Sequence, residues 1–164
     1  MRILGISGSL QRKSSNAMLL EVAASAAPTG VTLEIFDGLR HLPHFDPDIE
    51  NESGAPVSVA ALRRAVAESD ALLIASPEYG HSLPGSLKNA IDWLIGSGEL
   101  ENKLVAVTAA VPAKERGQRG LQALRDTLAA VSARIVGGEP LVRGPQFEQE
   151  VASLVAALVQ ASRG

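Results

Sequence analysis

Residues 71–75, ALLIA, and 103–110, KLVAVTAA, are almost unbroken apolar runs of strand length. A strand with one face in water alternates apolar and polar residues, whereas a continuous apolar run predicts a strand that is buried on both faces. Strands of that kind are typical of parallel sheets that helices cover on both sides. The two runs therefore predict an α/β protein built around a parallel sheet.

Strands and helices alternate along the rest of the chain. Residues 40–56 are polar and proline-rich, and we expect a long loop there. Because parallel neighbours need helical crossovers, the alternation predicts an α/β sandwich, as one domain over residues 1–164. The other expected strands are 2–7, 31–36 and 134–136, and the expected helices are 16–27, 59–69, 83–94, 121–131 and 147–158.

The composition excludes several classes of protein. The 164 residues include 15 Lys and Arg against 18 Asp and Glu, for a net charge of −3. This balance lacks the broad basic surface on which nucleic-acid binding depends. The absence of cysteine excludes disulfides, cysteine-based zinc sites, iron–sulfur clusters and thiol catalysis. Redox chemistry would therefore require a bound cofactor.

The sequence also bears on location. No apolar run approaches the roughly 20 residues of a membrane helix. Residues 12–27 superficially resemble a signal peptide, but a strand-like segment precedes the basic pair and Glu21 interrupts the apolar run. We expect a cytoplasmic protein without a membrane or nucleic-acid partner.

The first candidate site follows the first expected strand. Residues 7–16 read SGSLQRKSSN and end at a predicted helix, whose N-terminal N–H groups and dipole attract anions. The segment fits neither the P-loop nor the G-x-G-x-x-G dinucleotide pattern. Its hydroxyl and amide side chains suit a terminal phosphomonoester, as on a mononucleotide. The alternative is a capped turn, with Ser14 or Ser15 as the N-cap.

The second candidate site follows the third expected strand. Residues 76–93 read SPEYGHSLPGSLKNAIDW, and the segment carries Tyr79, the only tyrosine. A loop at the carboxyl end of a strand, with an aromatic side chain, suits the rim of a pocket for a flat ring. The alternative is that Tyr79 packs over its own helix. We expect Ser82 to cap that helix and Trp93 to lie on its flank or at a subunit contact.

Taken together, the two segments resemble the NADPH-dependent FMN reductase family of flavodoxin-like proteins, which includes quinone, chromate and azo-dye reductases. The family patterns are G-S-L-R-x-x-S-x-N and P-E-Y-N-x-S-x-P-G-x-L-K-N-A-I-D-W. The matching residues are Gly8, Ser9, Leu10, Ser14 and Asn16 in the first pattern, and Pro77, Glu78, Tyr79, Ser82, Pro84, Gly85 and Leu87 to Trp93 in the second.

The resemblance implies a flavodoxin-like three-layer sandwich with a five-stranded parallel sheet of order 2-1-3-4-5. It implies hydride transfer from NADPH or NADH to FMN and then to a quinone, a flavin or a similar small acceptor. Because the flavin carries this chemistry, we expect no catalytic side chain. A homodimer or homotetramer is implied as well, with the helix in residues 82–93 at the contact.

The resemblance also assigns cofactor-binding residues. It places the FMN phosphate at Ser9, Ser14, Asn16 and Ala17, with Gln11 where the family usually has arginine, and the isoalloxazine ring beside the backbone of Pro77, Glu78, Tyr79 and Gly80.

Three departures from the family patterns stand out. Gln11 replaces an arginine, although Arg12 is adjacent, and Gly80 replaces an asparagine. Residues 109–120, AAVPAKERGQRG, replace a small, Ser/Gly-rich loop beside the flavin and bring the cations Lys114, Arg116 and Arg119. These cations either meet the phosphates of a nicotinamide nucleotide or form a solvated charged loop.

Other functions can be weighed against this one. An FMN carrier or sensor without NAD(P)H turnover, or a one-electron flavodoxin, would fit the same fold. Residues 80–84 come close to the nucleophile elbow of serine hydrolases. No histidine follows His81, however, and the strand ends about six residues too early.

A metal site is the last alternative. Its candidate ligands fit no standard zinc spacing, and Asn51 occupies the glycine position of a calcium loop, so we expect a polar loop instead. The ligands considered are His41, His44, Asp46, Asp48 and Glu50.

Overall fold

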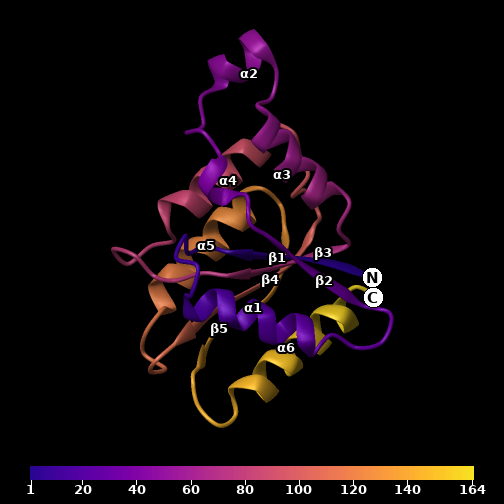
Figure 1. The fold of residues 1–164 in the computed structure, drawn as a ribbon, viewed down its shortest axis with the longest axis vertical. Coiled ribbons are helices and arrows are strands. Elements are labelled where there is room, and N and C mark those ends of the chain that lie inside the picture. Colours follow the sequence, from indigo (N-terminus) through magenta and orange to yellow (C-terminus); the bar gives the residue numbers. More distant parts are fainter.

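The computed structural model describes residues 1–164, except for the side chains of residues 50, 52 and 53 (Figure 1). The strands are β1 (Arg2–Ser7), β2 (Thr32–Phe36), β3 (Ala71–Ala75), β4 (Leu104–Val111) and β5 (Arg134–Val142). The helices are α1 (Ser15–Ser25), the short 3₁₀ helix η1 (Leu39–His41), α2 (Pro47–Ser53), α3 (Val57–Ala67), α4 (Gly85–Ile95), α5 (Gln118–Ala130) and α6 (Phe147–Ala161).

The strands form a five-stranded parallel sheet in the order β2-β1-β3-β4-β5, which confirms the predicted topology. Every residue of β3 and β4 is buried, as the apolar runs predicted. Helices α1 and α6 lie on one side of the sheet, and α3, α4 and α5 lie on the other (Figure 1). The chain therefore has the predicted three layers.

The two faces of β3 explain why its sequence does not alternate. Leu72 and Ile74 belong to the core cluster under α3, α4 and α5, whereas Leu73 and Ala75 belong to the cluster under α1 and α6. Successive side chains of a strand point to opposite faces, so two buried faces require an apolar residue at every position.

The structure corrects several predicted boundaries. Strand β5 continues far beyond residue 136, because Gly137 and Gly138 adopt positive φ angles of 73° and 111° within the strand rather than ending it. A register shift in β4 opposite these glycines marks a bulge. The expected loop 40–56 contains α2, and α4 begins after Pro84, so Ser82 does not cap α4.

None of the described helices is both long and apolar enough to cross a membrane.

Trp93 is fully buried, so the prediction that it lies on a helix flank or at a subunit contact is wrong. Its Nε1 donates a hydrogen bond of 2.9 Å to the carbonyl of Pro43, and its ring meets Phe45 edge-on at 5.0 Å. Asn89 on the same helix donates to that carbonyl at 2.9 Å and accepts from the Phe45 N–H at 2.7 Å. Two side chains of α4 therefore hold the segment before α2.

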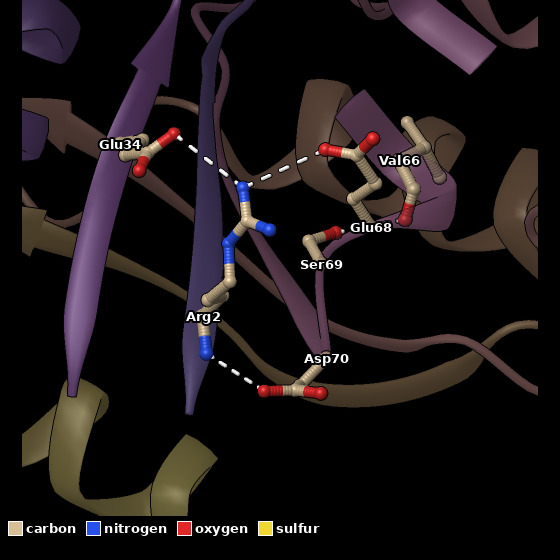
Figure 2. A network of polar contacts seen from close by, with 6 residues as sticks. All are labelled: Arg2, Glu34, Val66, Glu68, Ser69 and Asp70. Carbon is tan, nitrogen blue, oxygen red and sulfur yellow. Dashed lines mark hydrogen bonds and ion pairs between the residues drawn. The ribbon is translucent and has the colours of Figure 1, made fainter. Parts of the chain in front are cut away.

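Arg2 at the amino end of β1 and Asp70 just before β3 are joined by two hydrogen bonds, and Figure 2 shows the one to the Asp70 carboxylate. The Arg2 N–H donates to the Asp70 carboxylate at 2.7 Å, and the Asp70 N–H donates to the Arg2 carbonyl at 2.8 Å. The Arg2 guanidinium lies 3.9 Å from Glu34 and 3.7 Å from Glu68, in pairs that are more than half exposed. Long, exposed ion pairs contribute little to stability, so the two hydrogen bonds between Arg2 and Asp70 hold this end of the sheet.

We expect Asn89→Ala to lower the free energy of unfolding by about 1–3 kcal/mol, because it removes both bonds to the segment before α2. Lys88→Ala is the matched control on the same helix, since it breaks only the exposed Lys88–Asp92 pair. It should cost about 0.5 kcal/mol or less. Urea denaturation measures both, and equal losses would contradict the holding role of Asn89.

Candidate functional site

The two predicted loops lie against each other at the carboxyl edge of the sheet. The Gly8 N–H donates to the Ala75 carbonyl at 2.9 Å, and the Ser86 hydroxyl of α4 donates to the Gly8 carbonyl at 3.3 Å. A Cβ at Gly8 would lie 3.1 Å from Ser76 Oγ and 3.3 Å from Pro77 Cδ, so glycine permits this close approach. The structure thus brings both sets of predicted residues to one edge.

The loop after β1 ends in a capped helix. Ser14, rather than Ser15, is the N-cap of α1, and its Oγ accepts from the Ala17 N–H at 3.0 Å. Ser9 Oγ accepts from the Gln11 N–H at 3.2 Å. Both serines are buried, and each hydroxyl keeps its own proton for donation. The turn is therefore capped and still offers hydrogen-bond donors.

Asn16 connects this loop to β4. Its side chain is only 4% exposed, and its Oδ1 accepts from the Ala110 N–H at 2.9 Å. No described group accepts from its Nδ2. Because every fully buried polar side-chain atom among the described residues has a partner, Nδ2 reaches the surface of the loop. The amide thus keeps one end on the sheet and presents donors at the other.

These donors fit the phosphate of FMN. They are the Ser9 and Ser14 hydroxyls and the Asn16 amide, and they lie at the N-terminus of α1, whose dipole and free N–H groups attract anions. Ser9, Gln11 and Ala17 also line a pocket of about 240 Å³ beside the loop. Gln11 and Arg12 are exposed, and both line the same pocket.

Arg40 of η1 also reaches this site, and no motif in the sequence marks it as a site residue. Its Nη2 donates to the Leu10 carbonyl at 2.6 Å, and the side chain lines the same pocket as Arg12. A cation that is 30 residues away in the sequence therefore reaches the loop in which Gln11 replaces the arginine of the family. The position of Arg40 beside this loop depends on the path of the chain after β2, which the sequence does not reveal.

The loop after β3 is a tight turn. Tyr79 and Ser82 exchange two backbone hydrogen bonds of 3.0 Å, and Gly80 and His81 have φ angles of 57° and 63°. Tyr79 is 56% exposed, which favours a place on the rim over packing against its own helix. Pro77 at the start of this turn lies against Gly8, so the turn and the loop after β1 are neighbours at this edge.

The side chain of Glu78 reaches the start of α5, which follows β4 at the same edge of the sheet. Its Oε2 accepts from the Gly120 N–H at 2.9 Å, in the first turn of a helix whose N-cap, Gly117, has no side chain. Arg119 donates to Nδ1 of His81 at 2.9 Å. The loop in residues 109–120 is therefore tied to the loop after β3, and Arg119 is not simply a solvated charge.

The metal alternative included Glu50, whose side chain lies outside those that the structure describes. Among the described side chains, no three His, Asp or Glu residues lie close enough to hold a metal ion.

We expect Gly120→Ala to destabilise the protein by about 1–3 kcal/mol, because its Cβ would lie 2.9 Å from Glu78 Cβ and 3.0 Å from Glu78 Cα. This clash outweighs the gain of about 1 kcal/mol from helix propensity. Gly85→Ala is the control, since a Cβ there meets nothing within 4 Å. Thermal unfolding compares the two, and an equally stable Gly120→Ala variant would contradict the contact.

The chain is similar to proteins that are named as reductases. The chain is 30% identical to a quinone reductase of Escherichia coli over 146 residues, 88% of this chain and 78% of that protein. It is 36% identical to an NAD(P)H-dependent FMN reductase of Pseudomonas aeruginosa over 130 residues, 78% of this chain and 69% of that protein.

Solved structures give the same fold. A flavoenzyme NAD(P)H:(acceptor) oxidoreductase from Paracoccus denitrificans superposes with a TM-score of 0.85 at 25% identity, covering 99% of this chain and 97% of that chain. A flavodoxin of Bacillus cereus, at 14% identity and a TM-score of 0.69 over 98% of both chains, supports the fold alone. The sequence model of NADPH-dependent FMN reductases matches residues 1–146. The chain belongs to the NADPH-dependent FMN reductase family and is an NAD(P)H-dependent flavin oxidoreductase.

Proposed function

We propose that this chain holds FMN across the carboxyl ends of β1, β3 and β4 and passes electrons from NADPH or NADH to a quinone, a flavin or a similar small acceptor. The observation that supports the proposal most is the set of hydrogen-bond donors at Ser9, Ser14 and Asn16, which lies against the loop after β3.

The residues of the chain would bind and orient the cofactor. Ser9, Ser14, Asn16 and Ala17 would hold the phosphate, and the backbone of Pro77, Glu78, Tyr79 and Gly80 would border the ring. Bound FMN supplies the hydride chemistry, accepting from the nicotinamide and giving to the acceptor. Gln11 has no charge to offer the phosphate, so Arg12 and Arg40 would supply the cations at this end.

The proposal of a quinone or flavin as the electron acceptor rests on the names of the relatives. One is named a quinone reductase and another an NAD(P)H-dependent FMN reductase, and both names describe a small-molecule acceptor. An FMN carrier or sensor would bind the cofactor in the same loops without NAD(P)H turnover. Family membership favours the reductase over that alternative.

We also propose a homodimer or homotetramer in the cytoplasm. Apolar side chains of the layer that contains α2, α3 and α4 are exposed, with Phe45 at 42%, Val57 at 88% and Ile95 at 57%. They, rather than the buried Trp93, would supply a subunit contact. Light scattering should give a mass of two or four chains of 17.1 kDa, and the mass of one chain would contradict the proposal.

A visible absorption spectrum tests the function. The purified protein is mixed with FMN, desalted, and then treated anaerobically with NADPH or NADH. We expect a retained flavin band that either nucleotide bleaches, and the faster nucleotide identifies the donor. A retained band that neither nucleotide bleaches would support the carrier. If no flavin band is retained, NAD(P)H is mixed with the protein and free FMN. Oxidation of the NAD(P)H would show a reductase that uses FMN as a substrate, and no oxidation would contradict the proposal.

Asn16→Asp tests the phosphate site separately from stability. The carboxylate can still accept from the Ala110 N–H, but it replaces the amide donor with a negative charge beside the phosphate. We expect an unfolding midpoint close to that of the unaltered protein and FMN affinity at least about tenfold lower. Fluorescence titration of FMN measures the affinity, and unchanged binding would exclude Asn16 from the site.

A further inference from the structure

The pocket beside the loop after β1 opens on the β2 side of the proposed FMN site. Its volume is about 240 Å³, and its walls come from that loop, the first turns of α1, the end of β2 and η1. Pockets that enclose a whole drug-sized ligand measure roughly 300–1,000 Å³. The cavity therefore has room for one end of a larger molecule.

The pocket is continuous with the phosphate site. Ser9, Gln11 and Ala17, which the proposed function places at or beside the FMN phosphate, line it, and no residue of the loop after β3 does. A ligand end in this pocket would therefore be attached on the phosphate side of the flavin and not on the ring side.

The lining chemistry is that of a nucleotide pocket. Arg12 and Arg40 are balanced by the carboxylates of Asp37 and Glu21, so the pocket suits a group with hydroxyls and one phosphate rather than a free polyanion. Asp37 directly follows β2, the position from which an acidic residue bonds ribose hydroxyls in doubly wound dinucleotide-binding folds.

The remaining walls suit a flat base. Ile35, Phe36 and Leu39 supply apolar surface. The ring of Phe36 lies over Gly38, where any Cβ would overlap it, so glycine at 38 permits the ring to take this place. Arg40 bonds the Leu10 carbonyl through one of its five N–H groups, which leaves others for a phosphate.

We propose that this pocket binds the adenylate half of FAD, so that the chain accepts FAD as well as FMN. The inference rests on the proposed function, because the flavin half of FAD would lie in the FMN site. The second phosphate of FAD would leave the loop toward Arg12 and Arg40, and its ribose would lie at Asp37.

Flavin affinities test the inference without any activity. Protein freed of flavin is titrated with FMN and with FAD, and the quenching of flavin fluorescence gives both dissociation constants. We expect the FAD constant to lie within about tenfold of the FMN constant, because adenylate contacts offset the cost of ordering the longer ligand.

Three variants test whether the adenylate half of FAD lies in this pocket. Asp37→Ala should weaken FAD about tenfold more than FMN, the loss expected for one charge-assisted hydrogen bond. Arg40→Ala removes a cation near the FMN phosphate as well, so it should weaken both flavins, with FAD losing about tenfold more because its second phosphate also loses a partner. Ile35→Trp fills the pocket without removing a polar contact and should have the same selective effect. Arg64→Ala, an exposed arginine on α3 outside this pocket, is the control and should change neither affinity.

The outcomes separate the two proposals. If FMN binds and FAD binds a hundredfold more weakly, or if the three variants leave the FAD-to-FMN ratio unchanged, the inference is overturned and the proposed function stands. If FMN-loaded protein binds 2′,5′-ADP and Arg40→Ala abolishes that binding, the pocket takes the adenosine of NADPH instead, and the FAD inference is overturned. If neither flavin binds, both proposals fail.

Discussion

The parallel direction of β1, β3 and β4 is the constraint on which the site depends. Their register sets Ser7, Ala75 and Thr108 side by side; β1 and β3 end at this level, and β4 continues in the same direction to Val111 beside β5. Helices bury both faces of the sheet, and the loops at its carboxyl edge are open to a ligand. Polar side chains from loops far apart in the sequence therefore gather at this edge.

Features encoded by neighbouring residues could be predicted from the sequence. The runs around Leu72 and Val105 revealed two-sided burial, and the serines before α1 revealed a capped, donor-rich turn. The family patterns then supplied the strand order and the flavin chemistry, which periodicity alone does not contain.

Features that depend on contacts between distant residues could not be predicted. Helical periodicity placed Trp93 on a flank, because nothing in the helix shows that the segment at Pro43 covers it. The extent of β5 was hidden by two glycines that usually end strands but here form a bulge. Arg40 and the Glu78–Gly120 contact likewise exist only once loops from separate strands meet.

The Gly80 departure has a simple conformational explanation. The residue has a φ of 57°, in the left-handed region that glycine adopts freely and that asparagine tolerates better than most other residues. Glycine in place of the family's asparagine therefore keeps the turn and removes only a side-chain amide. The departure at Gln11 is chemical instead, since it removes a charge that Arg12 and Arg40 can replace from neighbouring positions.

The contact between Glu78 and Gly120 also limits how this protein can change in evolution. A substitution at 78 removes the carboxylate that accepts from the Gly120 N–H, but it places no new atom against α5. A substitution at 120 meets the Cα and Cβ of Glu78 and requires the loop to take another path. Position 120 can therefore lose its glycine only together with a second change that moves the loop after β3.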